Sequence, residues 1–121
     1  MNRKKSIYSV TFDNKNPYWT KSRQMNVLFL RNVQNYMNDL LRFKEYPGLA
    51  KHLILNDVLD RLGFPKTKVG YIVGWIYDEK NPIGDNYIDF DINPRGSNPN
   101  VVLDFNVDGI IFDRLTYGVS D

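Results

Sequence analysis

The sequence predicts an α+β fold, in which one long amphipathic helix and one short helix pack on a three- or four-stranded antiparallel sheet. Two observations lead to this expectation. Between residues 22 and 43, apolar residues recur at spacings of three and four, which is the period of a helix with one buried face. From residue 69 to residue 113, runs of aromatic and β-branched residues alternate with turn-forming Gly, Asn and Asp. Neither a repeat nor a linker divides the chain, so we expect a single domain over residues 1–121.

The first part of the chain begins with a weakly alternating run and continues into the long helix. We expect residues 1–11 to form an extended arm or an edge strand. Thr20 or Ser22 can cap the start of the helix over residues 22–43, and a Pro-Gly pair soon after its end prevents its continuation. The apolar positions of this helix are Met25, Leu28, Phe29, Val33, Tyr36, Met37, Leu40 and Leu41.

A short helix is expected over residues 56–62. Asn56 is a residue type that caps helix N-termini, and Asp57 suits the positive end of the helix dipole. Gly63 is placed to end this helix, because glycine readily adopts the left-handed conformation of a C-terminal cap.

The remaining elements are expected to be strands, over residues 69–77, 86–92, 101–106 and 109–113. The first of them is apolar on both faces, which is typical of a central strand or of a strand whose outer face meets a partner. Gly74 within it indicates a bulge or a close approach of another backbone. Asp108 and Gly109 form a pair that predicts a tight hairpin. We expect residues 116–121 to be a frayed tail.

Composition excludes several classes of protein. Hydrophobic residues make up 42% of the chain, which is enough to form a core. No apolar run approaches the about 20 residues that a membrane-spanning helix needs. The absence of cysteine and the single histidine, His52, exclude disulfides, thiolate catalysis and zinc sites built from several Cys or His side chains. We therefore expect a soluble intracellular domain that does not associate with membranes.

Charge is distributed unevenly along the chain. Residues 1–70 carry 13 Lys/Arg and 5 Asp/Glu, a net charge of +8, whereas residues 71–121 carry 3 and 9, a net charge of −6. This asymmetry becomes a surface dipole only if the fold keeps the two halves apart. The basic residues are scattered around the long helix and the total is only +2, so direct nucleic-acid binding is not favoured.

Acidic residues of the predicted strands form the strongest candidate site. Alternation along a strand places Asp89 and Asp91 on the same outer face as Tyr87, and it places Asp104 outward on a neighbouring strand. Asp108 follows in the next turn. Such carboxylates could hold Mg²⁺ for phosphodiester chemistry, but no Glu or His completes a nuclease pattern. We expect no catalytic residue, no metal and no cofactor, and we expect a protein-binding surface instead.

Five blocks of the sequence carry a resemblance to a known family. They consist of Asn32, Gln34–Tyr36 and Asn38–Leu40, then residues 55–63, 73–78, 84–90 and 103–109. Together they resemble a domain of unknown function carried by phages and prophages of Firmicute-type bacteria, usually as the C-terminal part of a longer, membrane-associated protein. The chain departs from that pattern in having Asp91 where glycine is usual and a shorter segment at residues 95–100. The resemblance implies a viral or mobile-element origin and assigns no activity.

We therefore expect a small phage- or prophage-derived protein-binding domain that is not an enzyme. Its most concrete form is an inhibitor of a host defence effector, comparable to anti-CRISPR proteins, in the host cytoplasm. The partner would be a host or phage protein, including a nucleic-acid-binding effector. The expected contact residues are Asp89, Asp91, Asp104, Asp108, Tyr87 and Trp75.

Three other hypotheses remain open at the level of sequence. One is binding through the helical half, at Arg23, Arg31 and Arg42. A second is a structural or assembly component of a virion, which self-association of the two oppositely charged halves into a homo-oligomer would favour. The third is a metal-dependent nuclease, which divalent-metal binding at the carboxylates would favour.

Overall fold

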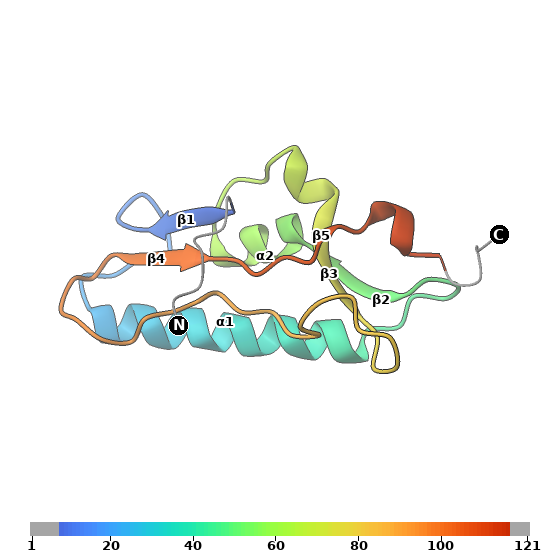
Figure 1. Cartoon of the computed structure of the whole chain (residues 1–121). Helices are drawn as coiled ribbons and strands as arrows, with labels where there is room; N and C mark the ends of the chain where they lie inside the picture. The colour runs from blue at the N-terminus through green and yellow to red at the C-terminus, as the bar shows by residue number, and fades with distance from the viewer. Residues whose placement is uncertain (1–7, 117–121) are drawn as a thin grey trace.

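The computed structural model describes residues 8–116. Its elements in chain order are β1 (Ser9–Phe12), α1 (Arg23–Phe43), β2 (Lys51–Ile54), α2 (Leu55–Leu62), β3 (Val73–Tyr77), β4 (Val101–Asp104) and β5 (Gly109–Ile110), with short 3-10 helices at Val69–Tyr71 and Phe112–Arg114. Helix α1 runs along the length of the molecule on one side, and the strands lie across from it (Figure 1). The predicted α+β class is confirmed.

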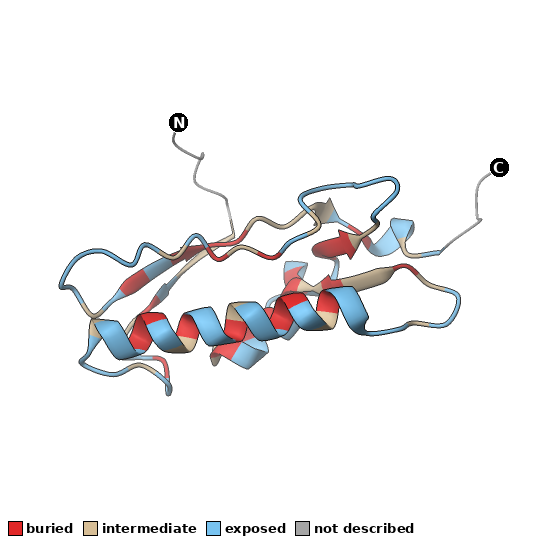
Figure 2. Ribbon diagram, turned by 90° about the horizontal axis from the view of Figure 1, so that it is seen from below, coloured by how far each residue is buried: buried red, intermediate tan, exposed pale blue. Residues whose placement is uncertain are grey.

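Helix α1 follows the expected range to within one residue. The Ser22 hydroxyl accepts a hydrogen bond from the N–H of Met25 at 3.2 Å, so Ser22 is the N-cap. One face of the helix is buried against the rest of the fold, and the opposite face is exposed along its whole length (Figure 2). Three apolar side chains that were expected on the buried face, Met25, Leu28 and Tyr36, are exposed.

Helix α2 begins one residue earlier than predicted and lacks a side-chain cap. Asn56 is not the N-cap. It lies within the helix, is buried, and its amide holds the following loop by exchanging two hydrogen bonds with the main chain of Thr67, at 2.8 and 2.9 Å. Gly63 ends the helix in the left-handed conformation, with φ of 88°, as predicted.

The described strands form two antiparallel sheets, so the expectation of a three- or four-stranded antiparallel sheet is confirmed for the larger one, and the second, two-stranded sheet was not predicted. Strands β1 and β4 pair as one antiparallel sheet, and β2, β3 and β5 form the other in the order β2-β3-β5. Strand β3 is central, as predicted, but it begins at Val73 because Val69–Tyr71 turns as a 3-10 helix. Gly74 marks a close approach, one of its two expected roles, since a Cβ there would lie 2.0 Å from the carbonyl oxygen of Leu53.

The predicted strand over residues 86–92 is absent, because side chains of α1 take the place of a strand partner. The N–H and carbonyl of Ile88 both bond to the amide of Asn38, and the N–H of Phe90 donates to Gln34 Oε1 at 2.8 Å. On its other side, the carbonyl of Phe90 accepts from the N–H of Asp104 at 3.0 Å. The segment therefore runs extended between α1 and β4 (Figure 1).

The predicted hairpin at Asp108 and Gly109 is also absent. Gly109 has the expected positive φ, 114°, but β4 and β5 on its two sides belong to different sheets. The N–H of Asp108 instead donates to the carbonyl of Gly74 at 2.8 Å, which directs the chain from one sheet to the other.

The core lies between α1, α2 and the strands. Ile88, Phe90, Leu103 and Phe105 point into it, as their alternation predicts. A smaller cluster, built from Ala50, Ile76 and Ile111, forms a second core. Thr116 forms an isolated bridge with Leu49, and the rest of the expected tail, residues 117–121, lies outside the described residues, as do residues 1–7 of the expected arm.

Candidate protein-binding surface

Trp75 is not a surface residue. Its side chain is 0% exposed at the centre of β3, and the indole Nε1 donates to Asn106 Oδ1 at 2.9 Å. The expectation that Trp75 anchors a partner was wrong, because β3 is covered on both faces by the fold itself. The indole instead connects the core to Asn106, whose side-chain amide also bonds to Asp85, Tyr87 and Asp89.

Asp104 was expected to face outward, and it is buried, with 6% of its surface exposed. It lies opposite Ser9 in the pairing of β1 with β4, and one of its carboxylate oxygens accepts from the Ser9 hydroxyl at 3.3 Å. Its N–H donates to Phe90. Asp104 is therefore enclosed between β1 and the extended 88–90 segment, which leaves little of its surface for contact with a partner.

Asp108 is half-buried and serves the fold. One carboxylate oxygen accepts from the N–H of Ile76 at 2.9 Å, and the carboxylate packs so closely against Gly84 that a Cβ there would lie 2.0 Å from it. Burial raises the pKa of Asp108 above its ordinary value of 3.8; the hydrogen bond from Ile76 lowers the pKa in part, and the charge of Asp85 raises it.

Four residues that remain accessible are gathered around Asn106. The Asn106 amide nitrogen donates to an Asp85 carboxylate oxygen and to the carbonyl of Tyr87, both at 2.9 Å. Its amide oxygen accepts from the N–H of Asp89 at 2.8 Å. Asp89 in turn accepts from the N–H of Asp91 at 2.9 Å. We call Asp85, Tyr87, Asp89 and Asp91 the acidic segment.

Tyr87 is the aromatic residue of the acidic segment. Its side chain is 46% exposed, and its hydroxyl accepts from Gln34 Nε2 at 3.0 Å. Asp85 and Asp91 on either side of it are exposed, whereas Asp89 is half-buried. The ring is thus held in one position while much of its surface faces solvent, an arrangement that suits contact with another protein.

The fold does not keep the two charged halves of the sequence apart. Lys51 lies opposite Tyr77 in the β2–β3 pairing and forms an ion pair with Glu45, with an N–O distance of 3.3 Å. Lys51 also shares a shallow pocket with Asp78, and the Arg42 guanidinium lies 5.7 Å from the centre of the Tyr77 ring. At this point of the surface, basic residues of the first half of the sequence therefore lie beside Asp78 and Tyr77 of the second half.

Other candidate chemistries find little support in residues 8–116. The described His, Cys, Asp and Glu side chains form no group of three or more that could hold a metal ion. His52 has a structural role, since its Nδ1 lies 2.7 Å from the carbonyl oxygen of Ala50 and its ring packs on Tyr46 with centroids 4.2 Å apart. No helix in this part of the chain is long and apolar enough to cross a membrane.

The residues that organise this surface were missed at the sequence level. Gln34, Asn38 and Asn106 were not singled out for any role, yet their amides position residues 85–90. For Gln34 and Asn38, however, the sequence did contain an indication of this role. They lie one turn apart in the amphipathic helix next to the buried Val33 and Met37, where an amide must find a hydrogen-bond partner.

Comparison with known proteins places the chain in a family. A family model matches residues 1–114. The chain belongs to DUF6353, a family of unknown function. Searches of curated proteins and of solved structures gave no significant match. Membership in this family transfers no activity and no functional residue, so any function must be argued from the surface itself.

Proposed function

We propose that this DUF6353 chain is a protein-binding domain whose acidic segment docks on a basic surface of a partner protein. The observation that carries the proposal is the half-exposed Tyr87 ring, held at its hydroxyl by Gln34, in a segment whose Asp85 and Asp91 are also exposed. Large aromatic side chains with a polar tip contribute strongly to binding at the centres of interfaces. Carboxylates beside them favour partners of opposite charge.

Rigidity of the acidic segment supports the same proposal. The backbone of residues 87–89 is bonded to Asn106, and Phe90 is bonded to Gln34. Little conformational entropy would be lost on binding, so most of the contact energy would appear as affinity. An enzyme site built on these residues would need a base or a metal ligand set, and two of the carboxylates already accept hydrogen bonds within the fold, Asp89 from the N–H of Asp91 and Asp85 from the Asn106 amide.

The more specific form of the proposal is a phage- or prophage-derived inhibitor of a host defence effector, acting in the host cytoplasm. Its support is the resemblance of the five sequence blocks and the chemistry of the acidic segment. A nucleic-acid-binding effector presents a basic groove, and clustered carboxylates beside an aromatic ring are complementary to such a groove.

Site-directed photo-crosslinking tests the proposal. A photoreactive amino acid replaces Ile83, which is 39% exposed and lies beside the acidic segment without a hydrogen-bonded role for its side chain. The control carries the same amino acid in place of Phe43, an exposed residue at the end of α1. In bacterial lysate we expect a discrete crosslinked protein from position 83 only.

The captured protein is then produced alone and titrated against the chain. Binding that weakens when Asp85 and Asp91 are changed to Asn supports the proposal. Equal crosslinking from both positions, or binding that ignores these changes, would refute it.

A further inference from the structure

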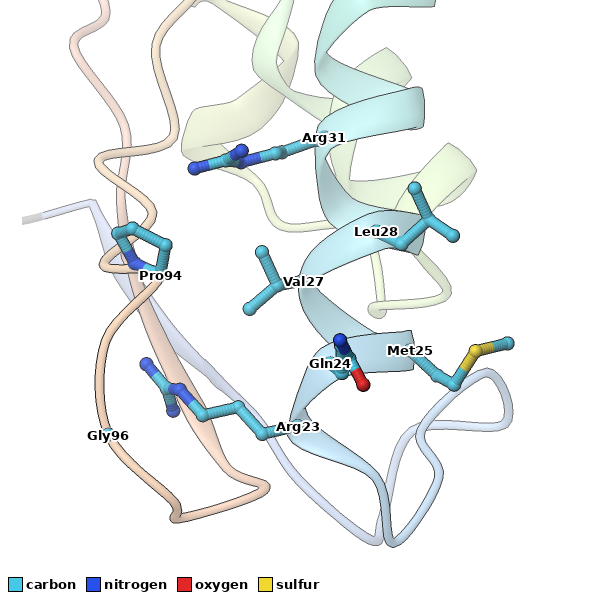
Figure 3. A pocket seen from close by; sticks show the side chains of 8 residues that line it. All are labelled: Arg23, Gln24, Met25, Val27, Leu28, Arg31, Pro94 and Gly96. Atoms are coloured by element: carbon cyan, nitrogen blue, oxygen red, sulfur yellow. The ribbon is translucent and has the colours of Figure 1, made fainter.

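A second surface of the molecule has the opposite chemistry. A groove of about 670 Å³ lies between the N-terminal half of α1 and the segment around Pro94. Figure 3 shows Arg23 and Arg31 reaching from the helix toward that segment with Val27 between them, and Met25 and Leu28 on the other flank of the helix. The groove therefore has two cations and Val27 on the side that faces the Pro94 segment, and Met25 and Leu28 line its margin on the other flank of the helix.

The apolar part of the groove is unusually accessible. Met25 is 56% exposed and Leu28 is 53% exposed, although both occur at helical spacing next to the buried Val27. Exposed aliphatic side chains are common singly, but here two of them adjoin a concavity. Filling the groove with an apolar side chain would remove this surface from water, which is favourable at about 25 cal/mol per Å².

The wall of the groove opposite α1 is held rigidly. The Arg23 guanidinium donates to the carbonyls of Asn98 and Asn100, at 2.6 and 2.9 Å, and also to the carbonyl of Asn93. Asn26, which is fully buried, donates to the carbonyl of Pro99 at 2.8 Å. The groove is thus already formed without an occupant, and binding would order little of the protein.

Positive charge in the groove is not neutralised by the protein. Arg23 uses its N–H groups on neutral carbonyls, so its charge remains. Arg31 is exposed and makes no ion pair or hydrogen bond with any residue from 8 to 116. None of the residues that line the groove is acidic. The planar guanidinium of Arg31 is well suited to a carboxylate, which it can bind through two parallel N–H donors.

We propose that this groove is a second docking site, which receives an acidic segment of a protein carrying a bulky apolar side chain. The apolar residue would occupy the space beside Met25 and Leu28, and a neighbouring carboxylate would bind Arg31. This inference does not depend on the acidic segment, which would attract partners of the opposite charge.

Two other kinds of anionic partner fit the groove less well. A nucleic-acid strand requires a row of cations along its backbone, and only two arginines line the groove. A membrane surface requires an apolar stripe over several helical turns, whereas the exposed polar residues Asn32 and Asn35 follow Leu28 on α1.

Selection from a random peptide library displayed on phage tests the inference. The bait is the full chain. We expect enrichment of peptides in which Asp or Glu flanks Leu, Phe or Trp. One enriched peptide is labelled with a fluorophore and titrated by fluorescence polarisation against the wild type and against Arg31→Glu and Leu28→Ser. Both changes affect exposed side chains, and urea unfolding checks that each variant is folded.

Matched changes at the far end of the same helix are the controls, namely Arg42→Glu and Phe43→Ser, which also affect exposed side chains. We expect Arg31→Glu to weaken peptide binding by about tenfold or more, because it replaces attraction by repulsion. Leu28→Ser should also weaken it, and neither control should.

The inference is overturned if no acidic, apolar-anchored peptide is enriched, or if such a peptide binds Arg31→Glu as tightly as the wild type. It is also overturned if single-stranded DNA or vesicles of phosphatidylcholine with phosphatidylglycerol displace the peptide as readily as an unlabelled copy does. Enrichment of basic peptides that still bind Arg31→Glu would support the acidic segment as a site and would count against the groove.

Discussion

Asn38 on α1 pairs with the main chain of Ile88 through both atoms of its side-chain amide. Nδ2 donates to the Ile88 carbonyl oxygen at 2.9 Å, and Oδ1 accepts from the Ile88 N–H at 2.7 Å. A helix thereby supplies the hydrogen bonds that a strand would supply in a sheet. One turn earlier, the Gln34 amide oxygen accepts from the N–H of Phe90, and its Nε2 donates to the hydroxyl of Tyr87. The position of the acidic segment therefore depends on two amides of α1.

Replacing Asn38 by Ala should lower the free energy of unfolding substantially. The N–H and carbonyl of Ile88 would both remain buried without a partner, at a cost of about 2–4 kcal/mol. Asn35→Ala is the matched control, since Asn35 is exposed on the same helix and should change stability by less than about 0.5 kcal/mol. Urea unfolding of both variants measures the difference. Equal stabilities would show that water can replace the Asn38 amide.

Gly74→Ala should destabilise the three-stranded sheet. The new methyl group would lie 2.0 Å from the carbonyl oxygen of Leu53 and 2.8 Å from Cα of Ile54, so β2 and β3 would have to separate. We expect a loss of about 3 kcal/mol and a lower melting temperature by calorimetry. Val102→Ala, at an exposed position of β4, should cost less than about 1 kcal/mol. A Gly74→Ala protein with an unchanged melting temperature would contradict the close packing.

Asp108 makes a contribution to stability that depends on pH. Burial raises its pKa in the folded protein above 3.8, so the folded state holds this proton more tightly than the unfolded chain does. The contribution of Asp108 to the free energy of unfolding is fully present below pH 3.8 and is lost as the pH rises through the raised pKa. Its ionised form is tolerated at neutral pH at some cost.

Asp108→Asn should remove this dependence while keeping an oxygen that accepts from the N–H of Ile76. We expect the variant to be at least as stable as the wild type at neutral pH, and to lose less stability than the wild type between acidic and neutral pH. Urea unfolding across that range measures both slopes. Asp113→Asn, at an exposed aspartate, is the control. Parallel slopes for wild type and Asp108→Asn would contradict the raised pKa.

Asp91 has a left-handed backbone, with φ of 55°, which disfavours most side chains. Asp91→Gly should therefore keep stability or raise it by about 0.5 kcal/mol, whereas Asp91→Val should lower it by about 1–2 kcal/mol. Urea unfolding distinguishes the two variants. A glycine variant clearly less stable than the wild type would mean that the Asp91 carboxylate itself stabilises the turn.

Binding of a partner to the acidic segment should weaken as salt is added. Neutralising Asp85 and Asp91 together by Asn should lower the association rate and cost about 1–3 kcal/mol of affinity at low salt. The difference should shrink near 0.1 M salt, where charges separated by more than about 10 Å are screened. Asp39→Asn with Asp113→Asn, two exposed carboxylates elsewhere, is the control in the same stopped-flow titration. Equal effects of both pairs would indicate a response to net charge alone.

Elements whose residues carry their own periodic pattern could be predicted from the sequence. The long helix was predicted over residues 22–43 and occurs at Arg23–Phe43, because its apolar spacing and its serine cap are local features. Alternation placed Ile88, Phe90, Leu103 and Phe105 in the core correctly. For Gly74 the sequence indicated a bulge or a close approach of another backbone, and the structure shows the close approach, because glycine alone leaves room for a neighbouring backbone.

Tertiary structure decided what the polar residues do. Periodicity reports which side chains are buried. It does not report whether the backbone groups of a segment bond to a neighbouring strand or to side-chain amides, and the pattern of residues 86–92 is the same in both cases. Only the fold brings Gln34 and Asn38 against that segment and so removes the predicted strand. Only the fold covers the outer face of β4 at Asp104 and surrounds Trp75. The candidate surface was therefore recognisable as acidic from the sequence, whereas its members were selected by packing between segments far apart in the chain.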